Sequence, residues 1–176
     1  MFKLDNMSFS ALNEEQVQVS VNARQVFEYL EQVRKQQEQF QGSMHWKKVS
    51  GQDYLYRGYT GGRAASLGVR TRETEEIKHK FDAEKNELAT TYKSLSEKIK
   101  MHAGFIRAAN LNRLPVTAAK VIRKFNNEGI PYRIIGTNAL YVFEQYAGVQ
   151  IAPQHLATMD VDILMDSRQA IKIVSG

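Results

Sequence analysis

Two aspartates near the end of the chain, Asp160 and Asp162, have the residue type and spacing of a catalytic metal site. They lie two positions apart in the β-type run 158–164, and successive side chains of a strand point to opposite faces. We therefore expect both carboxylates on the same face of a strand over about 159–164. Carboxylate oxygens are the ligands that Mg²⁺ prefers. The pair predicts half of a magnesium site.

A phosphate-binding turn is predicted upstream of this pair. The run Tyr132–Ile135 has the pattern of a strand, Gly136-Thr137 that of a tight turn, and a helix follows from about Asn138 to 146. Backbone N–H groups at the start of a helix are a ready site for phosphate. A phosphate site beside paired carboxylates suits nucleotide chemistry, so we expect the turn to lie close to Asp160, with 132–135 and 159–164 as neighbouring strands.

Long helices are expected on the N-terminal side of this region. An apolar stripe at helical spacing predicts a helix from 14 to about 40, with Asn13 and Gln16 as a capping pair. A second helix, from about 72 to 111, has apolar residues at alternating three and four spacing. We expect the second helix to be an antiparallel partner of the first, or to bend near Gly104. Further along, Pro115 and Gly129 bracket a shorter helix.

Between the long helices the hydrophobic period changes from helical to alternating. This pattern, with the turn sequence at 50–53, predicts a β-hairpin over about 44–60, followed by a glycine-rich loop. The segment 41–72 also concentrates positive charge, with six Lys or Arg residues against a single Asp. Trp46 and three tyrosines are interleaved with these cations. The segment could therefore hold nucleic acid by charge and stacking, or it could be a solvated basic loop.

Composition limits the class of protein. The chain has 176 residues, 43% of them hydrophobic, and a net charge of +5. It is long enough to bury a core, and it contains no apolar run that could cross a membrane. The absence of cysteine excludes disulfides and thiolate metal sites, and it suits a cytoplasmic protein. The first residues lack the apolar core of a secretory signal.

Several motifs together resemble a known family. Residues 115–168 are similar to the polymerase-β type nucleotidyltransferase superfamily, which has a Gly-Ser turn before a helix and then an Asp-x-Asp strand. From about residue 41 onward the chain resembles a bacterial family of nucleotidyltransferase-fold proteins. The shared stretches are Met44-His-Trp-Lys-Lys48, Tyr54-Leu-Tyr56, Ser66-Leu-Gly68, Thr74-Glu75, Gly136-Thr-Asn-Ala-Leu-Tyr141 with Glu144, Ala147-Gly-Val149 and Ala157-Thr-Met-Asp-Val-Asp-Ile-Leu164.

The resemblance implies a fold, an activity and a set of site residues. It implies an α+β protein with a helical part containing the hairpin over 1–114 and a partial nucleotidyltransferase domain over 115–176. Gly136, Thr137 and Asn138 would contact a nucleoside triphosphate. Asp160 and Asp162 would be the catalytic residues that hold Mg²⁺, or Mn²⁺ in its place. The reaction would transfer a nucleoside monophosphate to an acceptor that is RNA, protein or a small molecule.

The chain departs from the superfamily pattern in two ways. The turn residue is Thr137 rather than serine, which keeps the hydroxyl. The superfamily takes a third carboxylate from a later strand, whereas here we expect Asp166 to cap a final helix together with Gln169. We therefore interpret the chain as the front part of a longer protein, with little activity alone and an open sheet edge that invites self-association. The alternative readings are a non-catalytic nucleic-acid-binding module at 41–72 and a helical protein that dimerises through 72–111.

Overall fold

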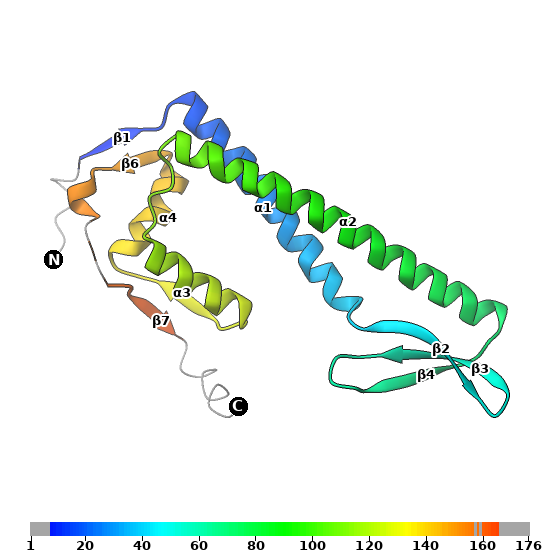
Figure 1. The fold of residues 1–176 in the computed structure, drawn as a ribbon. Helices are drawn as coiled ribbons and strands as arrows, with labels where there is room; N and C mark the ends of the chain where they lie inside the picture. The colour runs from blue at the N-terminus through cyan, green and yellow to red at the C-terminus, as the bar shows by residue number, and fades with distance from the viewer. Residues whose placement is uncertain (1–7, 157, 159, 166–176) are drawn as a thin grey trace. The chain divides into compact units, whose positions relative to one another are not determined.

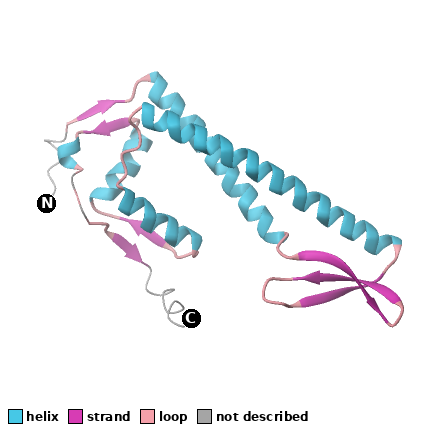
Figure 2. Ribbon diagram, viewed as in Figure 1, coloured by secondary structure: helices cyan, strands magenta, loops and turns pink. Residues whose placement is uncertain are grey.

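The structure is a computed structural model that describes residues 8–156, 158 and 160–165 (Figure 1). The chain forms two compact units, one made of Met1–Val21 with Phe105–Gly176 and the other of Asn22–Gly104. Helices and antiparallel strands are mixed along the chain, so the fold class is α+β (Figure 2). The N-terminal segment joins the first unit because it pairs with a strand near residue 150.

The two long helices form close to their predicted bounds. α1 spans Glu14–Gln39 and α2 spans Arg72–Ala108. The start of α1 has the expected capping pair, in which the Gln16 N–H donates to Asn13 Oδ1 over 2.8 Å and the Asn13 N–H donates to Gln16 Oε1 over 3.1 Å. This reciprocal bonding satisfies two backbone donors that a helix start leaves free. The predicted capping pair is confirmed.

In the unit Asn22–Gly104, an antiparallel sheet follows α1 (Figure 2). Its strands are β2 (Ser43–Val49), β3 (Gln52–Gly58) and β4 (Ala64–Val69), in the order β2-β3-β4. The predicted hairpin is therefore β2–β3, and the third strand was missed. Its sequence, Ala-Ala-Ser-Leu-Gly-Val, contains alanines and a glycine that are depleted in strands. Pairing with β3, rather than local propensity, makes this segment a strand.

The core of this unit lies between the two helices and one face of the sheet. Val33 of α1, Leu55 of β3, and Phe81 and Leu95 of α2 are buried. The rings of Phe40 and Phe81 lie 5.5 Å apart between centroids. The side chain of Gln37 also donates to the Leu88 carbonyl over 3.4 Å. The predicted antiparallel pairing of the helices therefore holds within this unit.

The other unit contains two short antiparallel ladders. β1 (Phe9–Ala11) pairs with β6 (Val149–Ile151), and β5 (Tyr132–Ile134) pairs with β7 (Ile163–Met165). A 3-10 turn, η2 (Pro153–His155), follows β6. Three-residue strands are too short to show a periodic pattern, and the partner of β6 lies near the start of the chain.

Two helices complete this unit. α3 spans Val116–Asn127, with Pro115 at its start, and α4 spans Thr137–Ala147. Gly129 has a φ of 65° directly after α3, as expected for a glycine that ends a helix. The helix predicted from Asp166, and its pairing with Gln169, lie outside the described residues.

Among the described residues, no helix is both long enough and apolar enough to cross a membrane.

Candidate functional site: a glycine turn beside an aspartate

The ladder between β5 and β7 brings the glycine turn and Asp162 together. In this register Ile134 lies opposite Ile163, and the Ile135 N–H donates to the Asp162 carbonyl over 3.0 Å. Asp162 therefore lies where β5 ends and the chain turns into α4. The prediction that 132–135 and the Asp-Val-Asp region are neighbours in one sheet is confirmed for β5 and β7. The strand starts later than expected, because β7 begins at Ile163.

Gly136 fits this position because it has no side chain. Its backbone has φ 63° and ψ −153°, a conformation that is essentially restricted to glycine. A Cβ added here would lie 3.1 Å from Asp162 Cγ and would collide with Asp162 Oδ2. The turn and the Asp162 carboxylate are thus in direct van der Waals contact. This close approach is the most specific geometric feature of the site.

Asn138 fixes the position of Asp160. Its side chain is only 1% exposed, and Nδ2 donates to the Asp160 carbonyl over 2.7 Å. The Asn138 side chain therefore ties the first turn of α4 to the backbone that carries the carboxylates. Its Oδ1 is buried and has no hydrogen-bond partner among the described residues. The sequence placed Asn138 against a nucleotide, whereas in the structure its amide contacts the protein backbone.

The start of α4 has no capping side chain. Thr137 is the first helical residue and is half-buried, and no side chain forms a hydrogen bond that caps this end. The first N–H groups of a helix lack partners within the helix, and they carry partial positive charge. An anion is therefore favoured at this end. The Asp162 carboxylate is one such anion, and a phosphate group is another.

Both aspartates are exposed. Neither Asp160 nor Asp162 forms an ion pair with a described residue. No group of three or more His, Asp or Glu residues that could hold a metal occurs within the part of the chain that the structure describes. The site thus offers two carboxylates to a cation. That the Asp160 and Asp162 carboxylates point to the same side stays a prediction. Residues 160–162 precede β7, and residue 159 is outside the described residues.

Behind the site, α4 is anchored by a buried ion pair. Glu144 is 2% exposed, its Oε1 lies 3.3 Å from an Arg113 side-chain nitrogen, and it accepts the Ile151 N–H over 2.6 Å. Arg113 also donates to the Ile151 carbonyl. The Glu144 side chain therefore lies inside this unit and not on its surface. Its carboxylate instead joins α4 to β6 and to the segment before α3.

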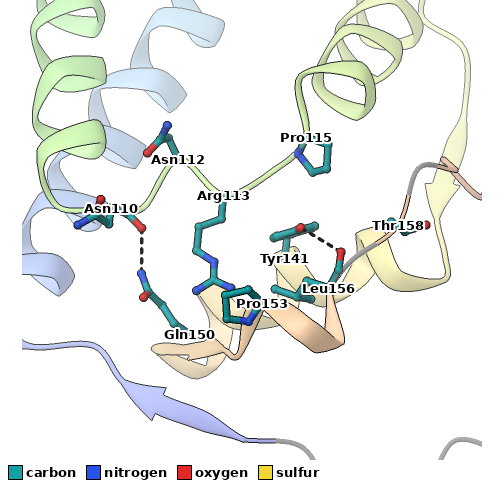
Figure 3. A pocket seen from close by; sticks show the side chains of 9 residues that line it. All are labelled: Asn110, Asn112, Arg113, Pro115, Tyr141, Gln150, Pro153, Leu156 and Thr158. Atoms are coloured by element: carbon teal, nitrogen blue, oxygen red, sulfur yellow. Dashed lines mark hydrogen bonds between the residues drawn. The ribbon is translucent and has the colours of Figure 1, made fainter.

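A pocket of about 560 Å³ opens on the same unit (Figure 3). Thr158, two residues before Asp160, lies at one end, and Asn110 and Gln150 form a hydrogen-bonded pair at the other. Tyr141 of α4 donates to the Leu156 carbonyl over 3.4 Å. The sequence reasoning missed this pocket, although the polar stretch Asn110-Leu-Asn-Arg113 was a signal for it. The full lining is Asn110, Asn112, Arg113, Pro115, Tyr141, Gln150, Pro153, Leu156 and Thr158.

Comparison with known proteins agrees with this geometry. A family model described as "Nucleotidyltransferase" matches residues 117–176. The match begins in α3 and includes the glycine turn, α4 and both aspartates. This part of the chain is thus similar to a nucleotidyltransferase family, which supports a nucleotidyltransferase-like function in general terms. No curated protein and no solved structure matches the chain.

Proposed function

We propose that the site binds a nucleoside triphosphate together with Mg²⁺ and transfers the nucleoside monophosphate to an acceptor hydroxyl. The observation that carries the proposal is the contact between Gly136 and Asp162. A phosphate at the α4 N-terminus and a cation on Asp162 would then be neighbours. Nucleotidyl transfer requires this neighbourhood, because the cation must bridge phosphate oxygens.

The donor set fits a divalent metal. Asp160 and Asp162 are oxygen ligands, are exposed, and have no competing cation among their described neighbours. When bound, Mg²⁺, or Mn²⁺ in its place, would neutralise phosphate charge and lower the pKa of the attacking oxygen. Asn138 would hold the Asp160 backbone in place, since its amide already bonds that carbonyl. Mutating such supporting groups typically weakens metal binding about 10–100-fold.

The protein's own groups would mainly position the substrate. The N–H groups at the start of α4 and the Thr137 hydroxyl would hold phosphate oxygens, so that the α-phosphorus faces the acceptor. The acceptor oxygen would form a bond to the α-phosphorus while the bond to pyrophosphate breaks. The pocket offers amide groups and a tyrosine, and it ends at Thr158, whose hydroxyl accepts the Asp160 N–H over 3.3 Å. It is the natural place for the nucleoside or the acceptor, which is RNA, protein or a small molecule.

We expect Mg²⁺ to strengthen the binding of a labelled, non-hydrolysable nucleoside triphosphate. In Asp160→Asn and Asp162→Asn variants this Mg²⁺-dependent binding should fall at least about tenfold, since even outer-shell groups of metal sites contribute this much. Fluorescence anisotropy at fixed salt measures the affinity with Mg²⁺, with Mn²⁺ and with EDTA. Transfer of label from NTP to RNA, protein and small-molecule acceptors then tests the reaction itself.

Glu87→Gln is the matched control, because it also removes one exposed carboxylate but lies in α2, in the other unit. It should leave nucleotide binding unchanged. The proposal fails if the wild-type chain binds no triphosphate in the presence of Mg²⁺, or if Glu87→Gln weakens binding as much as Asp162→Asn does.

A further inference from the structure

One face of the β2-β3-β4 sheet carries two rows of side chains. Residues directly opposite each other on neighbouring strands point to the same face of a sheet. The register places His45 opposite Tyr56 and Tyr56 opposite Ser66. The next row contains Lys47, Tyr54 and Val69. Two tyrosines thus occupy the central strand, with a cation and polar groups on the strands beside them. We refer to this face as the open face.

The open face points away from the helices. Leu55 lies between Tyr54 and Tyr56 in the strand, so its side chain is on the opposite face, and it is 0% exposed. Arg57 shares that opposite face, and its guanidinium lies 5.1 Å from the centroid of the Phe81 ring in α2. The helices therefore cover the Leu55 face. On the open face, His45 and Lys47 are exposed and the two tyrosines are half-buried.

The rings on the open face form a platform. The His45 and Tyr56 rings are stacked, with an angle of 20° between their planes and centroids 6.3 Å apart. Lys47 Nζ lies 5.6 Å from the centroid of the Tyr56 ring. Such an arrangement offers π-faces to unpaired bases and a cation to the backbone that joins them.

The charge around the platform is available to an anion. Three of the six cations in 41–72 bind oxygen atoms of the protein: Arg57 donates to the Gln39 carbonyl, Arg70 pairs with Glu75 and Asp53, and Arg72 pairs with Glu76. The hydrogen bond that Arg70 donates to Glu75 raises the pKa of Arg70, so that cation is committed to its pair. Within the described structure, Lys47, Lys48 and Arg63 form no ion pair. These three cations can neutralise phosphates.

We propose that the open face binds single-stranded RNA, with bases stacked on Tyr56 and Tyr54 and phosphates held by Lys47 and its neighbours. A duplex hides its base faces, so a stacking platform selects single strands. Ser66 and His45 flank Tyr56 on both sides and can bond to a ribose 2′-hydroxyl, which favours RNA over DNA. The inference does not depend on the proposed nucleotidyl transfer.

Binding of the full chain to a fluorescent 12-nucleotide RNA of mixed sequence tests the inference. Tyr56→Leu should weaken binding at least about fivefold, the lower end of the effect of losing one stacked base. His45→Ala, at an exposed position, should weaken it as well without affecting the sheet core. Lys47→Gln should lower the slope of log affinity against log salt by about 0.7, as expected for one lost phosphate contact.

Matched controls lie on α1 in the same unit. Tyr29→Leu and Lys35→Gln change exposed residues of the same types and should bind RNA as the wild type does. Asp162→Asn should also keep full RNA affinity, which separates this inference from the nucleotide site. The inference is overturned if wild-type binding is absent, if His45→Ala and Tyr56→Leu match the controls, or if DNA of the same sequence or duplex RNA binds as tightly.

Discussion

Replacing Arg113 with methionine should destabilise the protein by about 3 kcal/mol or more, because it leaves the Glu144 carboxylate buried without a cation. Glu144 is 2% exposed, and its remaining described partner would be the Ile151 N–H. Methionine keeps much of the aliphatic volume of arginine, so the effect reports lost charge rather than lost packing. For a chain of this length the loss corresponds to a drop of roughly 6–12 °C in the melting temperature.

The measurement must report on the unit that contains the pair. Trp46 is the chain's single tryptophan and lies in the other unit, so its fluorescence is a poor probe. Calorimetry and amide hydrogen exchange are better suited. The Ile151 N–H should exchange faster in Arg113→Met, since its acceptor is then an unpaired carboxylate.

A surface pair provides the control for this change. Lys124 lies 3.9 Å from Glu128, with side chains 72% and 47% exposed, and Lys124→Met should change stability by no more than about 0.5 kcal/mol. Adding Glu144→Gln to Arg113→Met should recover part of the loss, because the neutral amide still accepts the Ile151 N–H. Equal effects of Arg113→Met and Lys124→Met would show that the buried pair contributes little.

Elements with a sustained periodic pattern could be predicted from the sequence. Both long helices, the turn at Ser50-Gly51 and the strand–turn–helix run at 132–147 follow local patterns of hydrophobicity, glycine and proline. β1, β4 and β6 have no comparable pattern. They are short, or poor in strand-forming residues. β1 and β6 pair with each other from distant parts of the chain, and β4 pairs with the preceding strand β3. Such strands depend on tertiary contacts that one sequence does not display.

In the candidate site, too, the features that depend on local sequence could be predicted, and those that depend on tertiary packing could not. The sequence shows a strand, a glycine turn and a helix upstream of the paired aspartates, and this order predicted that the Gly136 turn lies close to the Asp-Val-Asp region. The roles of Asn138 and Glu144 did not, because each depends on what packs against α4. An amide and a carboxylate are read from sequence as surface or site residues, yet both are buried with backbone partners. The resemblance to nucleotidyltransferases indicated the candidate site, and packing determined which polar residues support it.

Replacing Gly136 with alanine should damage both stability and nucleotide binding. The new Cβ would collide with Asp162 Oδ2, and the backbone would remain in a region that costs about 1–3 kcal/mol for a non-glycine residue. The collision can be relieved only if Asp162 or the turn moves. Under the proposed function, Mg²⁺-dependent binding of the labelled triphosphate should then fall at least about tenfold.

Gly148→Ala separates the collision from the backbone strain. Gly148 has a φ of 64°, close to that of Gly136, but a Cβ there would meet nothing within 4 Å. Its replacement should cost only the left-handed strain of about 1–2 kcal/mol and leave nucleotide binding intact. Gly136→Ala should be less stable than Gly148→Ala. Adding Asp162→Ala to Gly136→Ala should recover the part of the stability that the collision costs, without restoring binding. If the two glycine variants bind the triphosphate equally well, the contact between Gly136 and Asp162 has no part in the site, because only one of them disturbs that contact.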